Sequence, residues 1–440
     1  MPALRMAVRR VMPPARACCR RMSHPPALLH AAATRRHVSS FGEGAGTTFQ
    51  RQPTNREFVN TLEFLAYPDV ALFQVMDEDG DIMDPVEEDE VMNGVGHEEA
   101  VKMYETMIRV SVMDNILYEA QRQGRISFYM TSTGEEATTV GSGSALDDRD
   151  VIFAQYREQG ILAYRGFTFE QFCNQCCSNA LDPAKGRQMP IHYGSVELNH
   201  HTISSPLATQ LPHAVGAAYA LKLEQQDSVA ICFFGDGAAS EGDFHAALNM
   251  AATLKAPVIF FCRNNGYAIS TPIEEQMASD GIVARGPAYG VPASRVDGND
   301  IFAVRSAVSK ARKLALEQET PVLIEAITYR MGHHSTSDDS LRYRQQGEME
   351  FWKEQDNPIL RMRNFLKKRG WYTDEQEEGL RKKSRKQVLS ALSAAEKAPK
   401  LGVAEMFEDV YDVLPPHLLE QKAEVAAHIA RHPDAYSSTH

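Results

Sequence analysis

The sequence predicts an α/β protein in which helices flank a parallel β-sheet, with a helical region at the C-terminal end. Residues 229–234 and 257–262 are short apolar runs rich in Val, Ile and Phe, without polar alternation. Such runs are typical of strands buried on both faces. A helical stretch at 241–254 separates them, and a strand–helix–strand unit of this kind is nearly always right-handed. Each run is followed at once by a polar cluster, as at the ligand-binding edge of such sheets.

The two polar clusters contain the chemistry of a metal–diphosphate site. Asp236 stands within Gly235-Asp236-Gly237 and offers a carboxylate, while Asn265 offers a neutral amide oxygen after the second run. Mg²⁺ takes one or two protein oxygens and completes its shell with water and phosphate. The glycines allow a phosphate to approach the backbone. An ordinary turn also contains Gly and Asp, but the paired clusters, with 26 residues (238–263) between them, favour the magnesium–diphosphate interpretation.

Further elements are predicted on either side of this unit. In chain order they are a helix at 101–123, a helix opening at 134–136, a strand at 150–154, a helix at 167–178, a helix after Pro206, a helix at 301–316, a strand at 321–329 and a mostly helical region from about 357. If the strands share one sheet, residues 155–157, 263–265 and 333–334 meet at its carboxyl edge. Arg157 and Arg263 are then suited to diphosphate oxygens. Either alone is more typical of a surface arginine, and their shared placement favours the functional interpretation.

Charge and hydropathy exclude some classes of protein. The 440 residues suffice for one large α/β domain or two smaller ones, and the formal net charge of −12 argues against a nucleic-acid surface. No apolar run approaches the ~18 residues that span a bilayer, so we expect no membrane insertion. Residues 1–42 contain eight arginines and no acidic residue. This pattern favours a mitochondrial transit peptide over a disordered basic tail.

The chain is therefore divided into four predicted parts. They are the transit peptide at 1–42, an N-terminal arm and loops at 43–100, a cofactor-binding α/β domain at 101–345, and a helical region at 346–440 that packs on that domain or on a partner. The acidic stretch 75–98 is interpreted as a loop. Cys173, Cys176 and Cys177 are close enough for metal or redox chemistry, but no second ligand pair accompanies them, and a reduced core cluster is the favoured interpretation.

Several motifs resemble one known family. They are 122–129 (Arg-Gln-Gly-Arg-Ile-Ser-Phe-Tyr), 156–158 (Tyr-Arg-Glu), 186–190 (Gly-Arg-Gln-Met-Pro), 202–210 (Thr-Ile-Ser-Ser-Pro-Leu-Ala-Thr-Gln), 238–243 (Ala-Ala-Ser-Glu-Gly-Asp), 264–270 (Asn-Asn-Gly-Tyr-Ala-Ile-Ser) and 333–339 (His-His-Ser-Thr-Ser-Asp-Asp). Together they resemble the alpha subunit of the 2-oxo acid dehydrogenases, with the branched-chain (2-oxoisovalerate) type as the best match. The resemblance covers roughly 65 to 435 and implies a thiamine diphosphate-binding fold.

The resemblance also implies roles for individual residues. Those expected to line thiamine diphosphate are Gln155, Tyr156, Arg157, Ser205, Leu207, Gly237, Ala238, Arg263 and His334. The expected Mg²⁺ ligands are Asp236, Asn265 and Tyr267 through its carbonyl, and the expected K⁺ site is Ser204, Pro206, Thr209 and Gln210. Without the resemblance, 202–210 is interpreted as a helix N-terminus with serine caps. The expected catalytic set is His334, Tyr156, Arg157 and Ser205. The family often has Glu where this chain has Asp236, and either carboxylate binds Mg²⁺.

The implied reaction is oxidative decarboxylation of branched-chain 2-oxo acids, with acyl transfer to a lipoyl group, in branched-chain amino acid catabolism. The cofactor carries the chemistry. His334, with a pKa expected near neutral, either contacts phosphate or shuttles a proton, while His333 is given a structural role. Residues 57–440 contain one cofactor-type unit, so a beta subunit is expected to complete the site in an alpha2 beta2 heterotetramer. The other implied partner is a lipoyl-bearing acyltransferase component, and the implied location is the mitochondrial matrix.

One regulatory residue follows from the resemblance. The family is inactivated by phosphorylation of the serine after the second His, here Ser335, which implies a kinase and a phosphatase. The family's second phosphorylated serine falls at Gln345, so control would rest on Ser335 alone.

Three alternatives remain open at this stage. One is the alpha subunit of pyruvate or acetoin dehydrogenase. A second is a Mg²⁺-dependent diphosphate hydrolase, in which Asp236 and Asn265 hold the substrate. The third is a non-catalytic partner subunit with a decayed site, against which the intact Asp236, Arg263, Asn265 and His334 argue.

Overall fold

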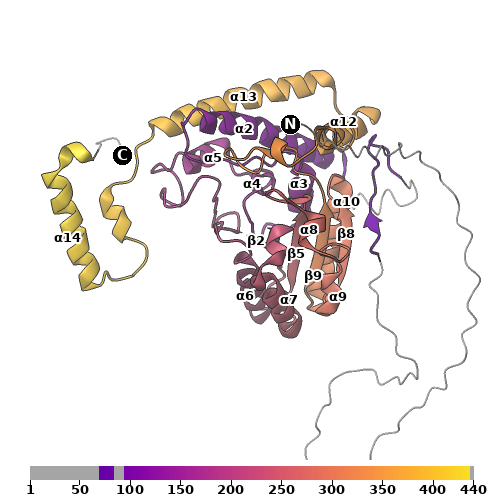
Figure 1. Ribbon diagram of the computed structural model, residues 1–440, viewed down its shortest axis with the longest axis horizontal. Helices are drawn as coiled ribbons and strands as arrows, with labels where there is room; N and C mark the ends of the chain where they lie inside the picture. The colour runs from indigo at the N-terminus through magenta and orange to yellow at the C-terminus, as the bar shows by residue number, and fades with distance from the viewer. Residues whose placement is uncertain (1–68, 84–93, 437–440) are drawn as a thin grey trace, which may run out of the picture. The chain divides into compact units, whose positions relative to one another are not determined.

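The computed structural model describes residues 69–83 and 94–436, and within them a seven-stranded, wholly parallel sheet forms the centre (Figure 1). The strand order is β1-β8-β9-β5-β4-β2-β3, and β6 and β7 form a separate antiparallel pair. The strands are β1 (Leu72–Phe73), β2 (Val151–Phe153), β3 (His200–His201), β4 (Ala230–Gly235), β5 (Val258–Asn264), β6 (Tyr267–Ala268), β7 (Thr271–Pro272), β8 (Ala293–Asp297) and β9 (Val322–Ile327). The predicted fold class is confirmed.

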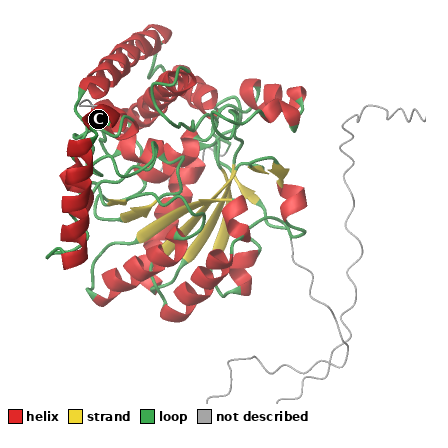
Figure 2. Cartoon of the chain, turned by 60° about the vertical axis from the view of Figure 1, so that its left-hand side comes forward, coloured by secondary structure: helices red, strands yellow, loops and turns green. Residues whose placement is uncertain are grey.

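Helices cover both faces of the sheet (Figure 2). In the described residues they are α2 (His97–Arg122), α3 (Glu136–Ser144), α4 (Gln159–Tyr164), α5 (Phe169–Cys176), α6 (Gln210–Leu223), α7 (Gly242–Leu254), α8 (Ile273–Gln276), α9 (Arg285–Ala288), α10 (Ile301–Gln318), α11 (Gln346–Glu354), α12 (Pro358–Lys368), α13 (Asp374–Lys397) and α14 (Pro416–Arg431). Short 3₁₀ turns occur at η1 (Gly237–Ser240), η2 (Ser340–Arg342), η3 (Val403–Phe407) and η4 (Pro433–Ala435). None of the helices described is long and apolar enough to cross a membrane.

Successive residues of the central strands belong to opposite cores. Phe233 on β4 and Phe261 on β5 pack together at 5.1 Å between ring centroids, in the cluster that includes α3 and α10. Their neighbours Phe234 and Phe260 lie in the cluster formed with α6 and α7. Both strands are buried along their whole length, so the continuous apolar runs correspond to strands covered on both faces.

Of the last two C-terminal helices, α13 packs on the α/β domain, whereas α14 packs on short 3₁₀ turns of its own region. α13 lies along α2 and also packs against α5 (Figure 1). Val388 and Leu392 of α13 share a buried cluster with Leu117 of α2 and Phe172 of α5. α14 packs on η3 and η4 and has no buried residue.

Some expectations from the sequence concern residues that the structure does not describe, and one needs revision. The predicted transit peptide and the arm at 43–60 lie outside the described residues. The stretch 75–98 is only partly described. Residues 75–83 are irregular, as expected for a loop, but their first residues are buried. Val75 and Met76 are buried, and their backbone N–H groups donate to Oδ2 of Asp300 at 2.8 and 2.7 Å. The buried Asp300 anchors this segment against the start of α10. The expected divisions at 42, 100 and 345 stay predictions.

Candidate active site

A cavity of about 410 Å³ opens at the carboxyl edge of the sheet. It is reached by the segments that follow β2, β4, β5 and β9. Its lining includes every residue predicted for the cofactor and for Mg²⁺, namely Gln155, Tyr156, Arg157, Ser205, Leu207, Asp236, Gly237, Ala238, Arg263, Asn265, Tyr267 and His334. The expected convergence of strand ends therefore occurs.

Strand register brings the polar clusters together. Gly235 at the end of β4 is the register partner of Arg263 on β5. The Gly235 N–H donates to Oε1 of Gln155 at 2.8 Å, which joins the end of β2 to the end of β4. A Cβ on Gly237 would lie 2.8 Å from Cβ of Ala268, so only glycine fits at the start of η1 without a shift. The backbone there stays open to a ligand.

Arg263 is held between two buried carboxylates that sequence reasoning did not assign to the site. Its Nε donates to Oε1 of Glu158 at 2.5 Å, and its Nη1 donates to Glu135. Arg263 and both carboxylates are essentially unexposed. Its Nη2 is buried and has no hydrogen-bond partner among the described residues. Arg263 is thus not a surface arginine, and one of its donors remains for a ligand.

Glu158 also sets the turn after β2. Its Oε2 accepts from the backbone N–H groups of Gln155 and Tyr156 at 3.0 and 2.8 Å. The same carboxylate therefore ties Arg263 to the segment that carries Arg157. Arg157 is equally buried, and its Nη1 donates to the carbonyl of Thr131 at 2.6 Å.

His334 lies between two arginines, and its pKa is not near neutral as the sequence suggested. Burial, followed by the charges of Arg157 and Arg330, lowers the pKa of His334 from 6.5 to about 3. Its Nδ1 lies 3.2 Å from Nη2 of Arg157 and 3.2 Å from Nη1 of Arg330. Because guanidinium groups only donate, Nδ1 accepts and the ring proton resides on Nε2. His334 is therefore a neutral donor through Nε2.

The predicted metal ligands present two side-chain oxygens. Asp236 is buried, which raises the pKa of its carboxyl, and its Oδ2 accepts from Nε2 of Gln276 at 2.7 Å. Asn265 donates through Nδ2 to Oε1 of Glu135 at 3.0 Å, while its Oδ1 lies 3.3 Å from the backbone N of Tyr267. Across the described ranges, no group of three or more His, Cys, Asp and Glu side chains could hold a metal. A metal at Asp236 would thus draw most of its oxygens from phosphate and water.

One part of the cavity lining, the apolar wall, consists of apolar side chains, and the lining also includes a hydrogen-bonded polar pair. Phe128, Met130, Met189 and Ile191 line it. The hydroxyl of Ser205 lies 2.7 Å from Nε2 of His192.

His192 adopts a defined tautomer in this pair. Its Nδ1 lies 3.1 Å from the carbonyl of Pro190, which can only accept, so Nδ1 carries the proton. Nε2 therefore accepts from the Ser205 hydroxyl.

The expected potassium residues lie beside the cavity rather than on it. Oγ1 of Thr209 is 3.3 Å from Oγ of Ser204 and 3.1 Å from the carbonyl of Pro206. The Gln210 side chain donates instead to the carbonyl of Phe233 at 3.0 Å. α6 begins at Gln210 with no side-chain cap, so the interpretation of 202–210 as a serine-capped helix start is wrong.

Hydrogen bonds to Asp338 hold the loop that follows His334, one from His334 itself and one from Tyr343. The His334 N–H donates to Oδ2 of Asp338 at 2.7 Å, and the Tyr343 hydroxyl donates to the same atom at 2.6 Å. Ser335 is buried, with its Oγ 3.2 Å from Oγ of Ser337. His333 accepts through Nδ1 from the Ser340 N–H at 3.1 Å, a contact that holds the loop.

Sequence reasoning missed Glu135, Glu158, Arg330 and His192 as site residues. Arg330 directly follows the predicted strand at 321–329, so the rule that identified Arg157 and Arg263 would have found it. Glu158 lies within the recognised Tyr-Arg-Glu motif. His192 lines the cavity from a long loop, whereas Glu135, at a helix start, meets the site through Arg263 and Asn265, and no local pattern marks either residue.

Other expectations in this region are confirmed. The cysteines at 173, 176 and 177 are free, and the first two are buried. Burial raises the pKa of Cys176 to about 12, as expected for reduced core residues without reactivity.

The fold and the cavity define an α/β protein whose cavity, lined by three arginines, lies at the carboxyl edge of a parallel sheet, where such sheets bind ligands. Residues 104–404 match the family of the dehydrogenase E1 component, and the chain belongs to this family. Among the curated proteins, it is 51% identical over 384 residues to 2-oxoisovalerate dehydrogenase subunit alpha 2, mitochondrial, of Arabidopsis thaliana, covering 87% of this chain and 80% of that protein. It is 52% identical to 2-oxoisovalerate dehydrogenase subunit alpha, mitochondrial, of Bos taurus, covering 87% and 84%. The counterpart from Dictyostelium discoideum is also 52% identical, covering 88% and 87%. The resemblance noted in the sequence is confirmed.

Proposed function

We propose that this chain is the alpha subunit of a thiamine diphosphate-dependent enzyme that decarboxylates branched-chain 2-oxo acids. The single observation that carries the proposal is Arg263, which is buried between two carboxylates and keeps one unpaired donor at the cavity lined by Asp236. Membership of the dehydrogenase E1 component family implies thiamine diphosphate. The relatives' name, 2-oxoisovalerate dehydrogenase subunit alpha, supplies the substrate class.

The residues present fit the diphosphate end of this cofactor. The unpaired Nη2 of Arg263 and the backbone at Gly237, where a side chain would collide with Ala268, form a cradle for phosphate oxygens. Asp236, Asn265 and the carbonyl of Tyr267 would hold Mg²⁺ between protein and diphosphate. Ser204, Pro206, Thr209 and Gln210 would bind K⁺ through hydroxyl and carbonyl oxygens, with Gln210 contributing its amide oxygen.

This chain's own side chains would orient the reactants. When bound, the cofactor supplies the electron sink that loss of CO₂ requires. Neutral His334 donates through Nε2, so it holds a phosphate or a substrate oxygen rather than delivering a positive charge. The Ser205 hydroxyl, fixed by His192, offers its oxygen lone pairs to the cavity. Tyr156 and Arg157 also line the cavity.

The apolar wall favours a branched aliphatic substrate. Phe128, Met130, Met189 and Ile191 present hydrocarbon and thioether surface without a charged group among them. Such a surface stabilises a side chain of three or four carbons by roughly 0.8 kcal/mol for each buried CH₂. The methyl group of pyruvate gains little from it.

The relatives are called alpha subunits and mitochondrial proteins, which implies a beta partner and a mitochondrial location. We extend this to an alpha2 beta2 heterotetramer in the mitochondrial matrix that passes the acyl group to a lipoyl-bearing acyltransferase component. In this scheme residues 101–345 form the cofactor domain, 346–440 the helical region, and a kinase and a phosphatase act on Ser335.

Co-expression with the beta partner tests the proposal. The purified complex should release CO₂ from 3-methyl-2-oxobutanoate only with thiamine diphosphate and Mg²⁺, and should prefer it to pyruvate in competition. Preference for pyruvate would assign the chain to the other branch of the family. Turnover of a diphosphate without any 2-oxo acid would support a hydrolase and overturn the proposal.

A further inference from the structure

We propose that Glu135 is a positioning residue for the metal–diphosphate unit. Its carboxylate aims Arg263 and also fixes which end of the Asn265 amide is presented to the metal. The inference rests on the proposed function and extends it to a residue that belongs to none of the strand ends.

Glu135 occupies a rigid position. It directly precedes α3, and its N–H donates to the carbonyl of Ser132 at 2.8 Å. Gly134 before it has φ +96°, and a Cβ there would collide with the carbonyl oxygen of Tyr329. The Glu135 side chain has no exposed surface. The backbone therefore delivers this carboxylate to one place, between the ends of β5 and β2.

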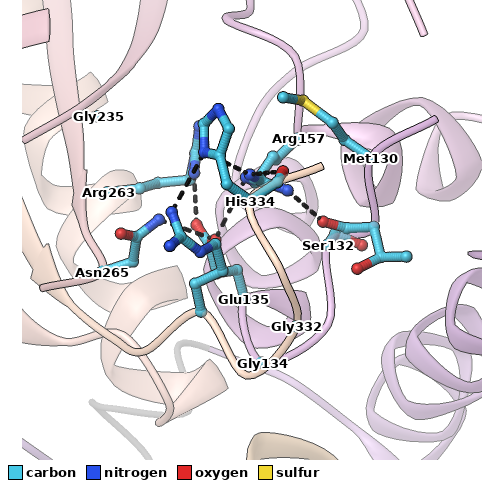
Figure 3. A network of polar contacts seen from close by, with 12 residues as sticks. Met130, Ser132, Gly134, Glu135, Arg157, Gly235, Arg263, Asn265, Gly332 and His334 are labelled. Carbon is cyan, nitrogen blue, oxygen red and sulfur yellow. Dashed lines mark hydrogen bonds and ion pairs between the residues drawn. The ribbon is translucent and has the colours of Figure 1, made fainter. Parts of the chain in front are cut away.

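Every polar side chain that meets this carboxylate in the described part of the chain is a donor (Figure 3). Oε2 accepts from Nη1 of Arg263, Oε1 accepts from Nδ2 of Asn265 at 3.0 Å, and Nε of Arg157 lies 3.8 Å from Oε1. Both oxygens must therefore accept. A carboxylate satisfies this requirement, whereas an amide of the same shape has only one accepting end.

The orientation of Asn265 follows from this requirement. Because Glu135 cannot donate, Nδ2 of Asn265 faces it, and Oδ1 on the other side of the amide accepts from the Tyr267 N–H at 3.3 Å. Oδ1 is the atom that Mg²⁺ would use. Without the carboxylate, only the 3.3 Å contact from the Tyr267 N–H to Oδ1 opposes a turn of the Asn265 amide, which would present its NH₂ group to the cation.

The Glu135 carboxylate also orients the Arg263 side chain. Glu158 holds its Nε and Glu135 holds its Nη1, so the planar fork has one orientation. Nη2 is the donor that remains without a partner among the residues described. Glu135 thus contacts both residues that would meet the metal–diphosphate unit, sharing Arg263 with Glu158 and Asn265 with the Tyr267 N–H.

The test measures Mg²⁺-dependent binding of thiamine diphosphate to the complex with its beta partner, by calorimetry, without turnover. In Glu135→Gln, the new amide accepts from Arg263 and turns its NH₂ toward Asn265. We expect the Mg²⁺ concentration for half-saturation to rise about tenfold, as a buried polar mismatch predicts. Glu136→Gln is the matched control, because burial raises the pKa of Glu136 to about 8 and its contact is to the Gly134 N–H. This control should bind as the wild type does.

A second substitution separates positioning from mere stability. Asn265→Asp alone places two carboxylates together and should weaken Mg²⁺ binding. The double variant Glu135→Gln/Asn265→Asp reverses donor and acceptor, since the amide introduced at position 135 donates to the new carboxylate and still accepts from Arg263. It should return half-saturation to within about threefold of wild type, a coupling that a purely structural role does not predict.

Two results would overturn the proposal. One is a Glu135→Gln complex that matches the Glu136→Gln control in its Mg²⁺ requirement. The other is a double variant that binds no better than Asn265→Asp alone, a comparison that holds even if Glu135→Gln cannot be purified. A wild-type complex that binds no thiamine diphosphate would instead refute the proposed function, so the two failures are distinguishable.

Discussion

Nη2 of Arg157 lies 3.2 Å from Nδ1 of His334, and the same Nη2 donates to the His334 carbonyl at 2.6 Å. An arginine that faces both the ring and the backbone of a histidine fixes its tautomer and disfavours its protonation. The imidazole is thereby held neutral, with its Nε2 proton as the available donor.

The first prediction concerns acid stability. The pKa of His334 is about 3 in the folded protein against about 6.5 unfolded, so between these values the unfolded state binds the additional proton. The contribution of neutral His334 to the free energy of unfolding is fully present above pH 6.5 and is lost as pH falls toward 3. At pH 5 the cofactor-free wild-type complex should lose stability relative to pH 7 by more than His334→Gln does. The difference in the free energy of unfolding between the two proteins should change by at most about 1.4 kcal/mol per pH unit.

Urea unfolding of the two complexes across this range measures the difference. His200, whose pKa burial also lowers to about 3, is present in both proteins and cancels. Parallel pH profiles would mean that His334 titrates normally.

Asp236→Ala should abolish Mg²⁺-dependent binding of thiamine diphosphate, because among the described residues Asp236 is the one carboxylate on the cavity lining. Gln276→Ala is the control, since it removes the 2.7 Å hydrogen bond to Asp236 and leaves the carboxylate in place. Calorimetry with the complex should show binding for the control only. Unchanged cofactor affinity in Asp236→Ala would refute the metal assignment.

Arg263→Ala should weaken cofactor binding and also destabilise the fold. Loss of a surface arginine would affect the cofactor alone, but Arg263 is the partner of two buried carboxylates. Removing one partner of a buried ion pair costs about 3–5 kcal/mol. Chemical unfolding of the cofactor-free complex measures this loss. A variant as stable as the wild type would show that Glu135 and Glu158 are satisfied in another way.

Ser335→Glu should suppress overall activity with the lipoyl acceptor and loosen the loop at 332–345. Ser335 is buried, with Asp338 pinned by His334 and Tyr343 beside it, so a new charge is repelled there. Ser337 is exposed, and Ser337→Glu is the matched control that should retain activity. Hydrogen exchange in the loop should rise for the first variant only. Equal activity and equal protection in both would exclude a switch at Ser335.

The central strand–helix–strand unit could be predicted because strands buried on both faces must be apolar throughout. The residues just after such strands then follow from position alone, which is why Asp236 and Arg263 were found. β8 was missed because its sequence, Ala-Ser-Arg-Val-Asp, is half polar and only partly buried. Glu135 could not be predicted, because its partner Arg263 is 128 residues away and their meeting depends on how α3 packs against the sheet.

The most direct test of the account is a crystal structure of the complex with its beta partner, Mg²⁺ and thiamine diphosphate. The account predicts the diphosphate at the carboxyl edge of β4 and β5, with an oxygen bonded to Nη2 of Arg263 and the metal on Asp236 and Asn265. Density for the diphosphate elsewhere, with Nη2 of Arg263 unoccupied, would contradict it.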